Sequence, residues 1–251
     1  MEKNKNKNKE VTWENLLSSA SRLQKIIPGA VLVGGSATAL HTHHRVSFDA
    51  DHIVSNLKEQ FNKILEELES VAGWETARIK PPVLILGSLD GVDTGIRQLI
   101  RKEPLETETI EILDRKITVP TMEEILRIKG ALILQRNATR DYLDFAVLSD
   151  GIGNERTCHA MEHFDQLYPQ KNEKSALMQL QVQLAHPLPY DLEDTDLSTY
   201  KNLQPKWHDW KTIEDICIHT SQILATELEA GIEQPPLTGH PPRHFPAPYV
   251  L

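Results

Sequence analysis

The chain has 251 residues, of which 39% are hydrophobic and 25% are charged, and its formal net charge at pH 7 is −9. This composition is typical of a soluble globular protein that can bury a sizeable core as one domain or two small ones. No apolar run approaches the roughly 18–20 residues that cross a bilayer, and the polar N-terminus has no apolar signal region. We therefore expect a cytoplasmic protein without a membrane partner, in which Cys158 and Cys217 are reduced. The negative charge argues against an extended nucleic-acid surface, although a local basic pocket stays compatible with it.

The first 120 residues are predicted to combine helices with short strands. The spacing of apolar residues predicts helices over residues 13–27 and 57–71, the first of which ends at Pro28-Gly29. A short helix is predicted after the Gly34-Gly35-Ser36 turn, with Ser36 as its N-cap. Asp90-Gly91 indicates a hairpin. The predicted strands cover residues 31–33, 47–54, 76–79, 83–89, 94–100, 107–113 and 117–119.

From residue 121 the pattern becomes helical. Helices are predicted over residues 121–148, with a break near Asn137, and over 156–167, 173–184 and 211–228, with an irregular connection over 185–209. Trp207 and Trp210 are expected to pack the last helix. The chain is therefore divided into a disordered tail (1–11), an α/β unit (12–120), a helical module (121–228) and a proline-rich tail (229–251).

Gly34, Gly35 and Ser36 stand between an apolar strand and a helix. A phosphate needs backbone N–H donors that no side chain obstructs, and glycine has no Cβ to block its approach. The Ser36 hydroxyl would add a donor. A tight turn with a capping serine is the simpler interpretation, but the acids that follow favour phosphate binding.

Asp49 and Asp51 are two residues apart on a predicted strand, so their carboxylates point to the same side. The apolar residues around them predict a strand that is partly buried on one side. Two adjacent carboxylates repel one another there unless a cation neutralises them. A divalent metal that bridges these acids and the phosphates of a nucleotide is the favoured interpretation.

A second charged pattern lies in the predicted helix over residues 121–148. Lys129, Arg136, Arg140 and Asp144 are spaced by seven, four and four residues, so on one continuous helix they would form a single stripe. An ordinary solvated face with an Arg140–Asp144 ion pair is the alternative. Asp141 could pair with a neighbouring Lys or Arg at the surface.

These two patterns, in this order, resemble a known superfamily. The glycine-serine turn followed by Asp-x-Asp is similar to the signature of minimal nucleotidyltransferases related to DNA polymerase beta. The Lys, Arg, Arg-Asp and Asp pattern resembles the AbiEii/AbiGii type of toxin, which is associated with phage defence, and the likeness covers about the first 150 residues. It implies a minimal nucleotidyltransferase fold of class α+β, in which a mixed β-sheet is flanked by helices and a C-terminal helical module follows.

The resemblance also implies roles for residues. Asp49 and Asp51 would be catalytic and hold Mg²⁺, with Mn²⁺ as an alternative. Lys129 would neutralise triphosphate charge, and Asp144 would orient or deprotonate the acceptor hydroxyl. Gly34, Gly35 and Ser36 would bind the triphosphate. Arg136 and Arg140 would either hold phosphates bidentately or fix Asp144.

Some polar residues fit the pattern less well. Many relatives carry a third catalytic acid on a later strand, but none of Asp90, Asp93, Glu106, Glu108 and Glu111 stands in a context that identifies it. Either Asp144 replaces that function or part of the site is lost. A zinc site at His41, His43 and His44 is disfavoured because no further ligand accompanies them, and His44-Arg45 is expected to pack against the second strand or to approach a phosphate.

Three functional hypotheses follow. The first is a Mg²⁺-dependent nucleotidyltransferase that moves a nucleoside monophosphate from a nucleoside triphosphate to an acceptor hydroxyl and releases pyrophosphate. The resemblance implies a toxin that acts on tRNA and is neutralised by an antitoxin protein. The second hypothesis is a nucleotidyltransferase of a small cationic molecule such as an aminoglycoside, which suits the acidic chain. The third is a nucleotide- or partner-binding module with a degenerate site.

Overall fold

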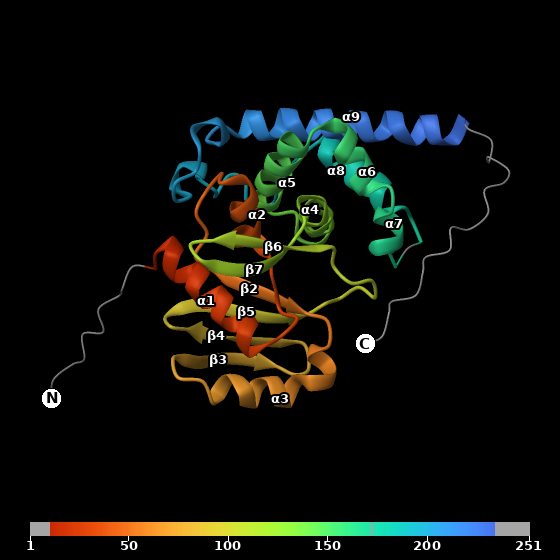
Figure 1. Ribbon diagram of the computed structural model, residues 1–251. Coiled ribbons are helices and arrows are strands. Elements are labelled where there is room, and N and C mark those ends of the chain that lie inside the picture. Colours follow the sequence, from red (N-terminus) through yellow and green to blue (C-terminus); the bar gives the residue numbers. More distant parts are fainter. Residues whose placement is uncertain (1–10, 172, 234–251) are drawn as a thin grey trace.

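The computed structural model describes residues 11–171 and 173–233 (Figure 1). The predicted tail over residues 1–11 therefore lies outside the described residues except for its last position, and so does the proline-rich segment from residue 234. No helix within the described ranges combines the length and the apolar character needed to cross a membrane.

A five-stranded mixed sheet forms the centre of the N-terminal half, with the strand order β1-β2-β5-β4-β3. Strands β2 and β5 are parallel, and the other neighbouring pairs are antiparallel. The predicted strands are confirmed in position, with ends that differ by at most three residues. The strands are β1 (Val31–Leu32), β2 (Ala50–Val54), β3 (Trp74–Lys80), β4 (Leu84–Leu89) and β5 (Val92–Gln98).

The hairpin predicted at Asp90-Gly91 joins β4 to β5. Leu89 pairs with Val92, so the loop has two residues. Asp90 and Gly91 have φ angles of 54° and 80°. Positive φ at both central residues matches the twist of the flanking strands, which is why Asp-Gly is favoured in this turn.

Helices α1 (Trp13–Ile26) and α3 (Leu57–Glu69) cover one face of this sheet, and α1 crosses in front of the strands in Figure 1. A capping box between Thr12 and Asn15 starts α1. The two helices and the sheet share a buried apolar cluster that includes Leu23, Phe61, Ile64, Leu68, Ile85, Leu89 and Ile96. The face of the sheet opposite this cluster carries Asp51.

The helical module lies above the sheet in the view of Figure 1. It comprises α4 (Met122–Arg136), α5 (Thr139–Ile152), α6 (Asn154–Met161), α7 (Phe164–Leu167), α8 (Ala176–Ala185) and α9 (Trp210–Glu233). The predicted break near Asn137 is confirmed, because this residue has a left-handed φ of 48° at the end of α4. The connection over residues 185–209 is irregular as predicted, apart from the short 3₁₀ turns η1 (Leu197–Thr199) and η2 (Pro205–Trp207). Helix α9 continues beyond residue 228, where the proline-rich tail was predicted to begin.

One apolar core joins the two halves of the chain. It contains residues of α1 and β1 together with residues of α4, α5, α8 and α9, such as Leu16, Leu32, Leu126, Phe145 and Leu180. The β6 (Thr107–Ile112) and β7 (Arg115–Pro120) hairpin also contributes to it. Residue 120 therefore marks the point where strands give way to helices, and one apolar core is shared by the segments before and after it.

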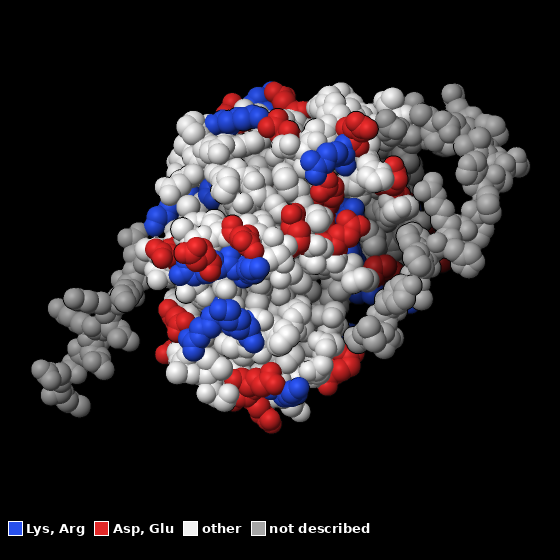
Figure 2. Space-filling view, viewed as in Figure 1, with Lys and Arg blue, Asp and Glu red and all other residues white. Residues whose placement is uncertain are grey.

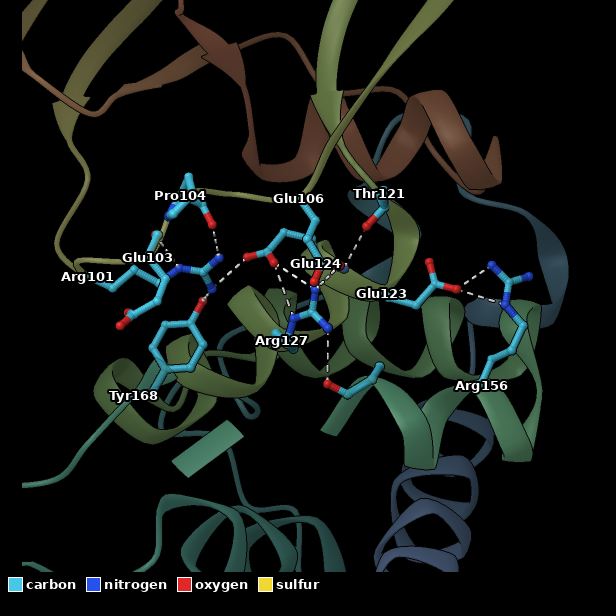
Figure 3. Close-up of polar contacts among 11 residues, drawn as sticks. Arg101, Glu103, Pro104, Glu106, Thr121, Glu123, Glu124, Arg127, Arg156 and Tyr168 are labelled. Carbon is cyan, nitrogen blue, oxygen red and sulfur yellow. Dashed lines mark hydrogen bonds and ion pairs between the residues drawn. The ribbon is translucent and has the colours of Figure 1, made fainter. Parts of the chain in front are cut away.

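A buried polar network fixes α4 against the connection between β5 and β6 (Figure 3). The Glu124 side chain is fully buried and pairs with Arg101 at 2.8 Å and with Arg127 at 2.8 Å. Arg127 also pairs with Glu106, and Arg101 donates to the Tyr168 hydroxyl at 3.1 Å. Because α4 also carries Lys129, this network helps to set the position of that side chain.

Candidate active site

Helix α2 (Gly34–Thr42) begins directly after β1, and its first turn is free of side-chain caps. Val33 is the N-cap residue and makes no side-chain hydrogen bond, and no acidic residue stands in the first turn. Gly34 has a φ of 72°, a conformation that glycine adopts without strain. The N-terminal N–H groups of a helix have no intrahelical acceptors, so this end of α2 offers donors and a positive dipole to a phosphate.

The prediction that Ser36 caps this helix is wrong. The positive φ of Gly34 turns the chain straight into the helix, which places Ser36 inside the first turn. Its buried hydroxyl donates to the backbone carbonyl of Asp49 at 2.6 Å. Ser36 thus joins the start of α2 to the start of β2. The hydroxyl that was predicted to add a phosphate donor is bonded to Asp49, and the backbone N–H groups of the turn stay as predicted donors.

Three carboxylates lie at neighbouring positions on one face of the sheet. Asp51 pairs in register with Gly95 of β5, and a Cβ placed on Gly95 would lie 2.1 Å from Asp51 Oδ1. Asp49 precedes Asp51 by two residues and Asp93 precedes Gly95 by two, so alternation along the strands places these acids on the same face. Asp49 and Asp93 are exposed. Sequence reasoning named Asp93 but assigned it no role, because the pairing of β2 with β5 was unknown.

The acids influence one another. Partial burial and the charges of Asp51 and Asp93 raise the pKa of Asp49, while Arg140 and Arg45 oppose this shift. Carboxylate oxygens are the donors that Mg²⁺ prefers, and Mg²⁺ is usually held by one or two carboxylates together with substrate phosphates. Within the described residues, no three His, Cys, Asp or Glu side chains are arranged to hold a metal ion. Asp49 and Asp51 would supply two of the carboxylate ligands that such a cation takes.

Arg45 lies against the glycine turn. A Cβ on Gly35 would approach its Nη2 atom to 2.4 Å, so a larger residue at this position would displace the guanidinium. Arg45 donates to Asp144 through Nε at 3.2 Å and Nη2 at 3.3 Å. Its guanidinium carbon is 5.5 Å from the centre of the Tyr200 ring. Arg45 therefore lies beside the glycine turn and is held there by Asp144.

Lys129 and Asp144 form the centre of a buried ion cluster. Lys129 Nζ is 2.6 Å from Asp144 Oδ2 and 3.3 Å from Asp141 Oδ1. His44 completes the surroundings of Asp144 through Nε2 at 3.0 Å. Burial alone would raise the pKa of Asp144, but Arg45, Lys129 and His44 hold it well below its usual range. A carboxylate with such a low pKa and no exposed surface is a weak proton acceptor.

The two arginines of the predicted stripe have different surroundings. Arg136 pairs with Asp141 through Nε at 2.5 Å and Nη2 at 2.7 Å, with 37% of its side chain exposed. Asp141 is fully buried, so it pairs with its cations in the interior and not at the surface. Arg140 is exposed and lies close enough to Asp49 to oppose the rise of that carboxyl's pKa. The break at Asn137 separates the stripe into two helices, and both arginines lie within electrostatic range of the acids, Arg140 of Asp49 and Arg136 of Asp51.

The irregular segment over residues 186–209 borders the same region. The backbone N–H of Val46 donates to the carbonyl of Lys201 at 2.9 Å, and that of Gln204 donates to the carbonyl of His44 at 2.8 Å. Lys201 Nζ lies 4.6 Å from the centre of the Phe48 ring. Tyr200 and Lys201 of this segment therefore contact Arg45 and Phe48, and no sequence motif indicated these contacts.

Comparison with curated sequences gives short matches. No protein-family model matches the chain. The heme uptake protein MmpL11 of Mycobacterium tuberculosis is 34% identical over 112 residues, which are 43% of this chain. The mycolic acid-containing lipids exporter MmpL11 of Mycolicibacterium smegmatis is 27% identical over 140 residues, which are 55% of this chain. The chain spans 11% and 14% of the lengths of these two relatives.

Comparison with solved structures gives matches over most of the chain. JHP933 from Helicobacter pylori aligns with a TM-score of 0.53 and 15% identity, covering 87% of this chain and 93% of JHP933. A second H. pylori structure, described as a candidate nucleotidyltransferase, aligns with a TM-score of 0.53 and 15% identity, covering 88% and 96%. With its mixed sheet and flanking helices, the chain therefore has the predicted α+β nucleotidyltransferase fold.

Proposed function

We propose that the protein is a Mg²⁺-dependent nucleotidyltransferase that moves a nucleoside monophosphate from a nucleoside triphosphate to an acceptor hydroxyl. The observation that supports this most strongly is the position of Asp49, Asp51 and Asp93 on one sheet face beside the uncapped start of α2. The Ser36–Asp49 hydrogen bond holds these two parts together. Acids for a cation and N–H groups for phosphates thus occur side by side, which phosphoryl transfer requires.

In the proposed reaction, the acceptor oxygen attacks the α-phosphorus and the bond from that phosphorus to the β-bridging oxygen breaks. Pyrophosphate leaves with the electrons of the broken bond, and we assign the exposed Asp93 as the group that takes the hydroxyl proton. Asp49 and Asp51 would hold the cation, which neutralises charge on the phosphate oxygens. The N–H groups of Gly34 and Gly35 would bind the phosphates.

The buried cluster has a positioning role in this proposal. Asp144 fixes Arg45 against Gly35, and Lys129 balances the charges of Asp144 and Asp141. The burial of Lys129 and Asp144 supports this role over direct contact with the triphosphate or the acceptor. The exposed Arg140 is the cation that we expect to contact substrate phosphate.

For the biological role, we propose a toxin that modifies tRNA and is restrained by an antitoxin protein. This part of the proposal is supported by the similarity of Lys129, Arg136, Arg140-Asp141 and Asp144 to the AbiEii/AbiGii motif. The net charge of −9 means that RNA contact would depend on local clusters of basic residues.

Incubation with Mg²⁺, total cellular RNA and each α-³²P-labelled nucleoside triphosphate in turn tests the activity. We expect one nucleotide to label RNA, and we expect Asp51→Asn and Asp93→Asn to reduce labelling by at least about 100-fold, since each removes several kcal/mol of transition-state stabilisation. Asp114→Asn is the matched control. Asp114 is exposed at the β6–β7 turn with a φ of 57°, which asparagine tolerates.

Labelling by Asp51→Asn at the wild-type rate would refute the proposed role of the acids. A parallel incubation replaces RNA by the aminoglycoside tobramycin. Labelling of tobramycin but not of RNA would retain nucleotidyl transfer and replace the proposed acceptor. Both incubations use the same protein preparation, and circular dichroism confirms that each variant is folded.

A further inference from the structure

A β-bulge in the edge strand β3 changes the direction of two basic side chains. Trp74 pairs with Leu89 and Thr76 with Gly87, but the next pair is Arg78 with Leu86, so the register shifts between Thr76 and Arg78. Strict alternation from Trp74 would place Arg78 on the face of the sheet that α1 and α3 cover. The extra residue of a bulge moves the following side chains to the opposite face.

Contacts on the neighbouring strands identify that opposite face. A Cβ on Gly95 would lie 2.1 Å from Asp51 Oδ1 and 3.3 Å from Leu86 Cδ2, so Asp51 and Leu86 lie on the same face. Arg78 is paired with Leu86 and therefore shares this face. Lys80, which is two residues further along β3 and paired with Leu84, shares it too. The bulge thus directs Arg78 and Lys80 to the face that carries the candidate catalytic acids.

Arg97 completes a row of three cations across this face. It follows Gly95 by two residues on β5 and is paired with Leu84. Its Nε atom lies 3.7 Å from Asp51 Oδ1, with 49% of its side chain exposed. We call Arg78, Lys80 and Arg97 the cationic strip. Arg78 and Lys80 are exposed, and no ion pair involves either of them within residues 11–171 and 173–233.

The strip differs from the opposite side of the molecule. Figure 2 shows the side that carries α1, where basic and acidic side chains are interspersed. On the face of the strip the three cations lie together, with Asp51 paired to Arg97 and with Glu75 on β3 before the bulge. The half-buried Leu84 and Leu86 lie between β3 and β5. The strip spans two strand spacings, or roughly 10 Å. In the strand order, β3 lies at the edge opposite β1, from which α2 starts, so a triphosphate bound at α2 leaves Arg78 and Lys80 available.

We propose that the cationic strip binds the phosphate backbone of a single-stranded RNA acceptor and directs its terminal hydroxyl toward Asp49 and Asp51. This proposal rests on the proposed function, because it names the acceptor surface of the same site. Phosphates of the nucleotides that precede the terminus would lie on Arg97, Lys80 and Arg78, with sugar or base atoms over Leu84. A cationic acceptor would be repelled by the same side chains.

The double variant Arg78→Glu/Lys80→Glu tests the strip without altering the acids. Its control is Lys58→Glu/Lys63→Glu, which makes the same charge change at exposed positions of α3 on the covered side of the sheet. Binding of a fluorescein-labelled single-stranded RNA oligonucleotide is measured by anisotropy over a range of salt concentrations. Binding of Mg²⁺ and nucleoside triphosphate is measured by calorimetry on the same preparations.

We expect the strip variant to bind RNA about 10- to 100-fold more weakly at low salt. Its slope of log affinity against log salt should be shallower by about 1.4, since each single-strand phosphate contact contributes about 0.7. Nucleotide binding should equal that of the wild type, and the control should keep its RNA affinity within about threefold, since it loses no phosphate contact.

Equal RNA affinity in the strip variant and the wild type would overturn the proposal. An equal loss of RNA affinity in the strip and control variants would overturn it too. Aggregation of the strip variant with unchanged RNA affinity would mean that the cations only protect the edge of β3. Tighter binding of tobramycin to the wild type than to the strip variant would also contradict the proposal, because the strip should repel a cation. If the wild type binds RNA through the strip but binds no nucleotide, the RNA-binding role of the strip is supported and the proposed function is refuted.

Discussion

Lys129 and Asp144 form a buried ion pair in which Nζ lies 2.6 Å from Oδ2 and the side chains are 3% and 0% exposed. Each charge is out of water and depends on its partner. Lys129→Met keeps most of the side-chain volume but leaves Asp144 and Asp141 with one cation fewer. We expect it to lower the free energy of unfolding by about 3–5 kcal/mol, as is usual when one partner of a buried pair is removed. Urea denaturation measures this change.

Lys63→Met is the matched control for that variant. Lys63 pairs with Glu67 at 3.8 Å, but 69% of its side chain is exposed. An exposed pair contributes little, so we expect a change within about 0.5 kcal/mol. Similar losses in both variants would contradict a special role for the buried pair.

The low pKa of Asp144 predicts how stability responds to acid. Its folded-state pKa lies well below the usual value near 3.8, because Arg45, Lys129 and His44 outweigh the effect of burial. The carboxylate therefore stabilises the fold fully at pH values above its unfolded pKa, and this contribution falls as the pH drops toward the folded pKa. Unfolding free energies measured from pH 7 to pH 2 should decrease more steeply below about pH 4 in the wild type than in Asp144→Asn. Parallel curves would contradict this assignment.

Repulsion among the acids predicts a response to divalent cations. Burial, Asp51 and Asp93 raise the pKa of Asp49, so ionised Asp49 is unfavourable in the protein without a cation. Mg²⁺ or Mn²⁺ should raise the melting temperature of the wild type, because a ligand that binds only the folded state stabilises it. Asp49→Asn should melt at or above the wild-type temperature without metal and should lose this response. Differential scanning fluorimetry measures both effects, and an equal shift in both proteins would argue against Asp49 as a metal ligand.

Gly95 leaves room for the carboxylate of Asp51. A methyl group at Gly95 would lie 2.1 Å from Asp51 Oδ1, so Gly95→Ala must displace that acid. We expect nucleotide transfer to fall by at least about 100-fold, comparable to the loss of a catalytic group, while the protein remains folded. Gly151→Ala is the control. Gly151 lies within α5, and a Cβ there would contact Met122 Cε at 3.4 Å. Transfer activity should not change, and the free energy of unfolding should rise by up to about 1 kcal/mol because alanine favours a helix more than glycine does.

Several local elements could be predicted from the sequence. The two-residue turn at Asp90-Gly91 needs a positive φ at both residues, and both residues have one. The apolar spacing of α3 follows the buried residues Leu57, Phe61, Ile64 and Leu68. The break at Asn137 was also predicted correctly. Each of these features is governed by a few neighbouring residues, through turn conformation or through the period of a helix.

The role of Ser36 could not be read in the same way. A serine at the start of a helix usually caps it, but here the N-cap is Val33, three residues earlier, and the Ser36 hydroxyl donates to the carbonyl of Asp49. The start of the helix was misplaced because the conformation of a glycine depends on the surrounding fold as well as on its neighbours.

The sequence by itself determined the residue types of the candidate site, namely a glycine turn, two acids at a strand's period and a charged helical pattern. Only the tertiary structure decided which of these side chains meet. It brought Asp93 beside Asp49 through the parallel pairing of β2 and β5, and it buried Lys129 with Asp144. It also directed Arg78 and Lys80 to the face of the acids through a bulge. Strand register and the burial of charged side chains depend on contacts between segments far apart in the chain, which local periodicity does not specify.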